Sequence, residues 1–463
     1  MKRNTYLTLL PPEEARANWF SCLEAKSFAL GEERIPLAQA LRRVLSRPVA
    51  ALRSSPAFHG AAMDGIAVHA EDTFNASART PLRLKIGTQA HWINTGHPLP
   101  AGCNAVVMVE NINTETTHDP QGETQWAVIE KAAFPWQHVR KMGEDMVATE
   151  IILPPGTSIG PYDLGALAAG GALEVPVFRR PRVSIIPSGS EIVPLVDARD
   201  EDLRAGRVLP EFNSLIFSAM ISEAGGEAAT LPVVPDEPEA IRAAIASAIA
   251  TADMVILNAG SSAGSHDFTA HVLEQMGTVI THGISVMPGK PTVLAVVDGK
   301  PVVGVPGYPV SAGISMEEFV LPLLALWQKR AMSERQKITT VPCNPLPSRP
   351  GMEERLRVKL GRVGETVVAV PLPRGAGTIT SLSRADGIIR IPRDSKGCNA
   401  GEPVTVELLR PATALAGALL VLVSDVIGRT LFAPHMIPIG IVTAFLGVPF
   451  FFALLIRRKK EFW

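Results

Sequence analysis

Three short loops rich in glycine and serine each follow an apolar run typical of a buried strand. They are PSGSEI (187–192), NAGSSAGSHDFT (258–269) and VPGYPVSAG (305–313). Glycine lets the backbone approach a ligand closely, and N–H groups at the start of a helix favour an anion. Gly-Ser turns are also common at strand ends without a ligand, so the inference depends on three such loops meeting at one sheet edge. Together they predict an oxyanion or phosphate ligand.

Charged side chains accompany these loops. Lys290 lies between a glycine and a proline in MPGKP, a rigid setting that would fix its ammonium, although it could also be an ordinary solvated lysine. Glu191, Asp236 and Asp267 lie beside the loops, and Mg²⁺ commonly takes one or two carboxylates together with substrate phosphates. For Asp236 the alternative is a helix N-cap, because a helical pattern follows it. We therefore expect a magnesium site at these carboxylates.

The loops belong to a stretch, residues 181–330, in which strand and helix patterns alternate. RVSIIPS and DMVILNAG are typical of buried strands, whereas SLIFSAMISEAG and EPEAIRAAIASAIA have helical spacing. This alternation predicts a parallel, doubly wound α/β sheet, which binds ligands outside the carboxyl ends of its strands.

Other segments have different patterns of apolar residues and turn residues. Two amphipathic helices are expected in residues 1–54, and this segment should pack with residues 139–180. Short strands between turn residues predict an inserted β-rich domain over 55–138 and a small β-barrel or sandwich over 335–410. Residues 411–463 are expected to form two hydrophobic helices.

Bulk composition excludes some classes of protein. A chain of 463 residues should form several domains. Its net charge of −1 provides no excess of positive charge for binding nucleic acid. Four cysteines without CxxC spacing argue against a disulfide framework and against a structural zinc site. These features favour the cytoplasm.

The C-terminal tail is unlike the rest of the chain. Residues 436–456 carry no charge and match the roughly 20 residues that cross a bilayer, and four basic residues follow at 457–460. Residues 412–433 could also span, although Asp425 and Arg429 interrupt them at helical pairing distance. Buried core helices are the alternative. By the positive-inside rule, two crossings would tether a cytoplasmic body to the membrane through residues 412–456.

The ordered motifs resemble the molybdopterin molybdenumtransferase (MoeA) family over about residues 1–410. They are AAMDGIAV (61–68), NTGHPLPAGCNAVVMVE (94–110), RKMGEDM (140–146), PPGT (154–157), PSGSEI, GSSAGSHDF, PGKP and VPGYPVSA. The resemblance implies an elongated N-terminal domain (1–54 and 139–180), an inserted β domain (55–138), an α/β molybdopterin-binding domain (181–330) and a C-terminal β-barrel-like domain (335–410). It also implies a homodimer with the site between subunits. The implied reaction inserts molybdate into adenylylated molybdopterin and releases AMP, with Mg²⁺.

The resemblance also assigns residues. It implies catalytic roles for Asp64, Asp145, Glu191, Asp236 and Asp267, of which the last three would hold the metal, and it places Glu144 in the same cleft. The residues implied at the pterin phosphate and molybdate are Thr95, Ser188, Gly260, Ser261, Ser262, Gly264, Lys290, Pro306, Gly307, Pro309, Ser311, Ser381 and Ser383. Backbone N–H, hydroxyl and lysine donors suit phosphates and a tetrahedral dianion.

Several positions depart from the family pattern. His59 stands where an aspartate is usual, Met287 where most members have a lysine just before Pro-Gly-Lys, and Tyr308 in place of an asparagine. PEFNS (210–214) replaces the usual Tyr-Asp-Thr-Asn. These changes remove an anion and a cation from the expected site. They motivate an alternative, in which the body binds molybdopterin or an oxyanion without turnover.

The tail has a resemblance of its own, to the last two membrane helices of iron-siderophore and cobalamin ABC importer permeases. About 45 residues match, including the Asp425 and Arg429 pair and PIGIVTAFLGVPFF. The interpretations of the tail are a membrane anchor, a permease remnant, or a gene-fusion or frame artefact. A third hypothesis follows, a membrane protein coupled to metal or oxyanion uptake.

Overall fold

A computed structural model describes residues 9–25, 29–120, 122–259, 268–332, 334–363 and 365–409. The chain divides into two compact units. Unit 1 comprises residues 1–29, 180–327 and 331–463, and unit 2 comprises residues 30–179 and 328–330. The two hydrophobic helices expected within 411–463 lie outside the described residues.

A six-stranded sheet forms the centre of unit 1. Its order is β16 (Glu227–Thr230), β13 (Arg182–Pro187), β17 (Met254–Ala259), β21 (Lys300–Pro306), β20 (Val293–Val297) and β18 (Thr278–His282). The first four strands pair in parallel, but β20 is antiparallel to both of its neighbours. The expectation of a wholly parallel sheet is therefore wrong at β20. Asp298 and Gly299 join β20 to β21 with φ of 50° and 76°, and two such residues form a tight hairpin turn.

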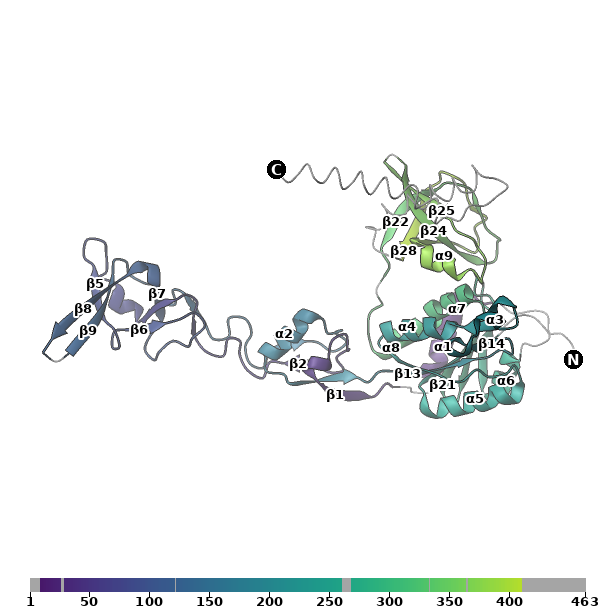
Figure 1. Ribbon diagram of the computed structural model, residues 1–463, viewed down its shortest axis with the longest axis horizontal. Coiled ribbons are helices and arrows are strands. Elements are labelled where there is room, and N and C mark those ends of the chain that lie inside the picture. Colours follow the sequence, from purple (N-terminus) through teal and green to yellow (C-terminus); the bar gives the residue numbers. More distant parts are fainter. Residues whose placement is uncertain are drawn as a thin grey trace. The chain divides into compact units, whose positions relative to one another are not determined.

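Helices cover both faces of this sheet (Figure 1). On one face lie α5 (Pro238–Thr251) and α6 (Thr269–Met276), whose Ile245 and Leu273 share a buried cluster with Leu257 of β17. On the other lie α1 (Pro12–Glu24), α4 (Asn213–Glu223) and α7 (Pro309–Ser315). Alternate side chains of β17 thus meet different helical layers, which is why the strands are apolar throughout. The doubly wound α/β class is confirmed.

The helix that begins at Pro309 continues through a π-helical turn, η5 (Met316–Val320), into α8 (Leu321–Trp327). Of the helices that the structure describes, this one alone is long and apolar enough to cross a membrane, and 83% of its apolar window is buried within the protein. Its burial is that of a core helix.

A closed sheet forms the C-terminal part of unit 1. Its strands are β22 (Lys337–Pro342), β24 (Glu353–Val363), β25 (Thr366–Pro371), β26 (Gly387–Ile391) and β28 (Val404–Leu408). Because β24 pairs with both β25 and β26, the sheet closes on itself, as expected for a barrel. The short strand β19 (Val286–Met287), from the central domain, adds to β24 in parallel. This pairing attaches the MPGKP loop to the barrel.

Unit 2 is built from short strand pairs. The strands are β1 (Glu32–Pro36) with β12 (Glu174–Phe178), β2 (Val49–Ala50) with β11 (Ile151–Leu153), and β3 (Gly60–Ala61) with β10 (Val139–Arg140). Two three-stranded sheets follow, β6 (Ala90–Ile93), β4 (Gly65–Val68) and β7 (Ala105–Met108), then β5 (Leu82–Lys85), β9 (Gly122–Ile129) and β8 (Ile112–Asp119). Its α-helix is α2 (Pro161–Ala169).

The second amphipathic helix expected in residues 1–54 is absent from the described structure. After β1 there is only one 3₁₀ turn, η1 (Leu37–Gln39), and Arg42 then takes a left-handed φ of 62°. Val44 and Leu45 form bridges with Ser158 and Val177. Their burial comes from tertiary pairing, which overrides the local helical spacing.

Candidate functional site

Three loops at the carboxyl ends of β13, β17 and β21 are joined by hydrogen bonds. The Ser188 N–H donates to the carbonyl of Asn258 at 2.8 Å. Asn213, the first residue of α4, donates from Nδ2 to Oδ1 of Asn258 at 3.3 Å and to the carbonyl of Gly307 at 2.8 Å. Asn213 and Asn258 are buried, and Asn213 Oδ1 has no partner among the described residues. Two buried amides thus organise the sheet edge where a ligand was expected.

No site role is predicted from the sequence for either asparagine. Asn213 lies in PEFNS, which departs from the family pattern, and Asn258 begins the glycine-serine loop. A buried amide costs free energy unless it is hydrogen-bonded. An asparagine at the end of a buried strand or the start of a helix was therefore the available sequence signal for a hydrogen-bonded group at this sheet edge.

The carboxylates expected to hold metal lie partly within the described structure. Asp236 is half-buried and accepts a hydrogen bond from Ser188 Oγ at 2.5 Å. Glu191 lies three residues after Ser188 in the PSGSEI loop and is exposed. Asp267 lies outside the described residues, together with Gly260, Ser261, Ser262 and Gly264. Among the residues that are described, no group of three or more His, Cys, Asp or Glu side chains could hold a metal. A magnesium site made of one or two carboxylates and substrate phosphates needs no such group.

The MPGKP loop is held against the core helix and presents Lys290 outward. Thr292 Oγ1 lies 2.8 Å from the Gly289 carbonyl and 2.6 Å from Ser315 Oγ, and the Lys290 carbonyl accepts from Ile284 N–H at 2.8 Å. The Lys290 side chain is exposed, and within the described part of the chain it forms no ion pair. Its ammonium is therefore available to an anion.

The PGYP loop meets the C-terminal domain. Pro306 ends β21, Gly307 follows, and Pro309 begins α7, where Ser311 is buried. The Val310 N–H donates to the carbonyl of Ala376 at 3.0 Å, and a Cβ on Gly377 would come within 3.3 Å of the Tyr308 ring. The segment leading into α9 (Ile379–Arg384) is thereby fixed beside the loop.

The two serines of α9 have different surroundings. Ser381 is buried, with 3% of its surface exposed, and accepts a hydrogen bond from Arg357 Nε at 3.1 Å. Ser383 is exposed and donates from Oγ to the Thr380 carbonyl of its own helix at 3.2 Å. The structure thus brings Ser381 to the arginines described next.

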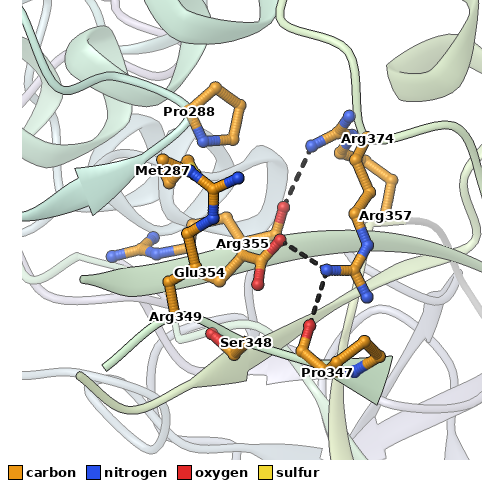
Figure 2. A pocket seen from close by; sticks show the side chains of 9 residues that line it. All are labelled: Met287, Pro288, Pro347, Ser348, Arg349, Glu354, Arg355, Arg357 and Arg374. Atoms are coloured by element: carbon orange, nitrogen blue, oxygen red, sulfur yellow. Dashed lines mark hydrogen bonds and ion pairs between the residues drawn. The ribbon is translucent and has the colours of Figure 1, made fainter. Parts of the chain in front are cut away.

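An arginine-rich cavity of about 390 Å³ lies between the MPGKP loop and the barrel. Figure 2 shows its nine lining residues, which are Met287, Pro288, Pro347, Ser348, Arg349, Glu354, Arg355, Arg357 and Arg374. The lining contains four arginines and one carboxylate, Glu354, which pairs with Arg374 at 2.8 Å. None of the four arginines was expected at the site from the sequence.

Arg355 and Arg357 lie on β24 and are almost fully buried. Arg355 pairs with Glu318 of η5 at 2.8 Å and with Glu353 at 2.6 Å. Burial lowers the pKa of Arg355, but these two carboxylates raise it and the net shift is upward. Arg355 Nη2 is buried without a partner in the described structure.

Arg357 is held by acceptors around it. Besides Ser381, it donates to the carbonyls of Arg355 at 3.0 Å and Pro373 at 2.8 Å. Burial lowers the pKa of Arg357, Glu354 opposes that shift, and the nearby charge of Arg374 adds to it. An anion in the cavity would relieve this crowding of positive charge.

The remaining carboxylates expected at the site lie in unit 2. Asp64 Oδ1 accepts from the Thr95 N–H at 2.6 Å and from Thr95 Oγ1 at 2.9 Å, and these hydrogen bonds lower the pKa of Asp64. The hydrogen bond from Arg140, followed by that from the Lys141 N–H, lowers the pKa of Glu144. Asp145 is exposed, and its N–H donates to the Ser55 carbonyl at 3.1 Å.

His59 connects two loops of unit 2. Its Nδ1 accepts from the Met142 N–H at 3.0 Å, and its ring centroid lies 4.7 Å from that of Trp136. The Lys141 ammonium lies 5.4 Å from the Trp136 ring centroid. Because Nδ1 is an acceptor here, this contact requires an Nδ1 without a proton. The histidine that replaces the usual aspartate therefore has a packing role.

The Thr95→Val variant should raise the pKa of Asp64. It removes the hydroxyl donor and keeps the backbone donor, so the pKa should move only part of the way to its ordinary value. A depressed carboxyl pKa stabilises the fold above the ordinary carboxyl range, and this stabilisation is lost as the pH falls through the folded-state pKa. Carbon-detected NMR titration measures the shift. An unchanged Asp64 titration would refute the role given to the hydroxyl.

Family models match three successive stretches of the chain. The "MoeA N-terminal region (domain I and II)" matches residues 10–171, the "Probable molybdopterin binding domain" matches 184–326, and the "MoeA C-terminal region (domain IV)" matches 343–409. A fourth model, the FecCD transport family, matches residues 404–457, of which the described structure includes only the first few.

Similar proteins match most of the same region. The chain is 31% identical over 396 residues to molybdopterin molybdenumtransferase 2 of Mycobacterium tuberculosis, covering 80% of this chain and 94% of that protein. It is 28% identical over 395 residues to the molybdopterin molybdenumtransferase of Bacillus subtilis, covering 82% and 90%. A molybdopterin biosynthesis MoeA protein of Pyrococcus horikoshii superposes with a TM-score of 0.71 at 31% identity, covering 87% of this chain and all of that one.

Proposed function

Because this chain belongs to the molybdopterin molybdenumtransferase (MoeA) family of molybdenum cofactor biosynthesis, we propose that it inserts molybdate into adenylylated molybdopterin and releases AMP. The observation that carries this proposal is the arginine-rich cavity beside the MPGKP loop. Molybdate is a tetrahedral dianion, and guanidinium groups form strong charge-assisted hydrogen bonds to such anions.

In this proposal the oxyanion binds at the cavity edge nearest Lys290, against Arg357 and Ser381. The buried guanidinium is fixed by its carbonyl acceptors, so little reorganisation is needed when the anion arrives. Lys290 supplies a second positive charge from the adjoining loop. The strand-end loops that carry Ser188, Asp236, Gly307, Pro309 and Ser311 would receive the pterin phosphate, and the proposal extends to Gly260, Ser261, Ser262 and Gly264.

Release of AMP requires a water molecule to add to a phosphorus atom of the pyrophosphate while the P–O bond to the other phosphate breaks. The products are AMP and the phosphorylated cofactor. Asp64 and Asp145 are the proposed acceptors of the proton from that water, and Thr95 fixes the carboxylate of Asp64 in one orientation. Glu144 is held by Arg140 and would act through charge.

Mg²⁺ is proposed at Glu191, Asp236 and Asp267. The two described carboxylates lie in loops at the same sheet edge, and oxygen donors of this kind suit a cation that also binds substrate phosphates. When bound, the ion would neutralise pyrophosphate charge. Asp236 would contribute Oδ2, because its Oδ1 accepts the hydrogen bond from Ser188.

Assembly and location are proposed from the resemblances. A homodimer predicts a sedimentation mass of twice 49.4 kDa. The body would work in the cytoplasm, and residues 412–456 would contact the membrane, so the full chain should sediment with membranes. A chain found only in the membrane-free fraction would refute the tether and leave the enzymatic proposal intact.

The test of the activity uses the purified full chain with Mg²⁺ and adenylylated molybdopterin. Adding molybdate should produce AMP, and omitting molybdate should suppress it. A protein that binds the pterin nucleotide but never releases AMP would instead be the non-catalytic binding module.

A further inference from the structure

We infer that the Tyr308 side chain is a stacking surface for a flat, fused ring of the substrate, either the adenine of the adenylate or the pterin. This inference rests on the proposed function, because it assigns a residue of this chain to the pterin nucleotide that the enzyme would bind. It concerns an uncharged aromatic contact, which recognises a ring, whereas the loops and arginines described above are suited to phosphate and oxyanion.

Tyr308 is an exposed aromatic residue at the edge of the sheet where a ligand is expected. It follows Gly307 in the loop after β21, and 66% of its surface is exposed. The phenylalanine and tryptophan side chains that the structure describes in unit 1 are all buried or half-buried. Covering an aromatic ring is favourable, so an exposed ring at the carboxyl end of a parallel strand is suited to contact a ligand.

The backbone that carries Tyr308 is held on both sides. Before it, the Gly307 carbonyl accepts a hydrogen bond from Asn213 Nδ2 at 2.8 Å. After it, the Val310 N–H donates to the Ala376 carbonyl at 3.0 Å. The Tyr308 side chain provides no hydrogen-bonded cap to α7. The loop therefore presents the ring without needing it, so replacing the ring should leave the fold intact.

One edge of the ring lies against a glycine of the C-terminal domain. A Cβ at Gly377 would lie 3.3 Å from Cδ1 and 3.5 Å from Cε1 of Tyr308, which are neighbouring atoms on the same edge of the ring. A side chain at position 377 would press on this edge. The glycine thus leaves room for the ring and supports its orientation, while the rest of the ring stays open to a stacking partner.

The turn that contains Gly377 also meets the arginine-rich cavity. The carbonyl of Gly375 accepts hydrogen bonds from Arg357 Nη2 at 3.4 Å and from Thr378 Oγ1 at 2.6 Å. Two residues of chain span at most about 7 Å, so Gly375 and Gly377 are close together. A phosphate or oxyanion held by Arg357 and a ring stacked on Tyr308 are therefore near enough to belong to one nucleotide.

The test compares ligands with and without the ring, by calorimetry on the purified full chain. The ligands are AMP, hydroxymethylpterin and ribose 5-phosphate, which has the sugar and phosphate of AMP but no base. Tyr308→Leu should weaken binding of the stacked compound about tenfold, and Tyr308→Phe, which keeps a ring, should stay within about threefold of the original. Ribose 5-phosphate should bind all three chains equally.

The matched control is Tyr162→Leu, which replaces an exposed tyrosine of α2 and should leave the binding of every ligand unchanged. The two ring compounds identify the source of the stacked ring. A loss in Tyr308→Leu with AMP assigns the contact to adenine, and a loss with hydroxymethylpterin assigns it to the pterin. Either loss supports the stacking surface.

Three results would overturn the inference. The first is Tyr308→Leu binding both ring compounds as tightly as the original chain, and the second is an original chain that binds neither of them. The third is an equal loss for AMP and ribose 5-phosphate, which would place the effect at the phosphate. Binding is measured without turnover, so a chain that shows the ring-dependent loss but releases no AMP would count against the proposed function and not against Tyr308.

Discussion

The Arg357→Lys variant should release AMP about 10²–10³ times more slowly than the original chain. Lysine keeps the positive charge, but its single ammonium cannot reach Ser381 Oγ and the carbonyls of Arg355 and Pro373 at once. The charge would no longer be held where the oxyanion is expected. Steady-state AMP release, measured against molybdate concentration, checks this.

The matched control for that variant is Arg390→Lys. Arg390 is an exposed arginine of β26 that pairs with Glu407, so the chemical change is the same but lies outside the cavity. AMP release by the control should match that of the original chain. Equal rates in both variants would show that Arg357 is not part of the catalytic machinery.

The Glu318→Leu variant should lose about 3–5 kcal/mol of unfolding free energy. Glu318 lies on η5 with 6% of its side chain exposed, and it pairs with Arg355, which is 1% exposed. Removing the carboxylate leaves a buried guanidinium with Glu353 as its remaining ionic partner. This ion pair also joins the core helix to the barrel, so its loss should weaken the contact that forms the arginine-rich cavity. Denaturant unfolding followed by circular dichroism measures the loss.

A double variant separates charge from packing. In Glu318→Leu combined with Arg355→Met the buried guanidinium is gone as well, although Glu353 loses its ionic partner, so part of the lost stability should return. As a surface control, Asp200→Ala breaks an exposed pair with Arg204 and should change stability little. A double variant no more stable than Glu318→Leu would show that shape, and not charge, sets the cost.

Periodicity predicted the central domain well, because strands buried on both faces are apolar and stand out between helices. The exception, β20, had a local signal in Asp298 and Gly299, a pair typical of tight hairpins. The prediction of a helix before residue 49 was wrong because Leu45 forms a bridge with Val177. This partner lies far along the chain, so no local pattern reveals it.

The family and the enzyme class were predicted from the sequence, whereas the roles of the site residues stay a prediction. The matched models and relatives confirm the family and the transferase class. The prediction succeeded because ordered motifs contain the residues that contact ligands, which composition does not reveal. The arginines were missed because RLRVKL resembles a half-exposed strand. In the structure, Leu356 and Val358 fill the barrel, while Arg355 and Arg357 are buried on the other side of β24. Recognising them requires knowing that a second layer covers that face.

The most direct test follows AMP release and molybdenum insertion in one sample. The purified full chain is incubated with Mg²⁺, adenylylated molybdopterin and increasing molybdate, and released AMP and pterin-bound molybdenum are quantified together. The account predicts that both rise together, with one AMP for each molybdenum inserted, and that both saturate. Pterin nucleotide that stays bound and intact at saturating molybdate would contradict it.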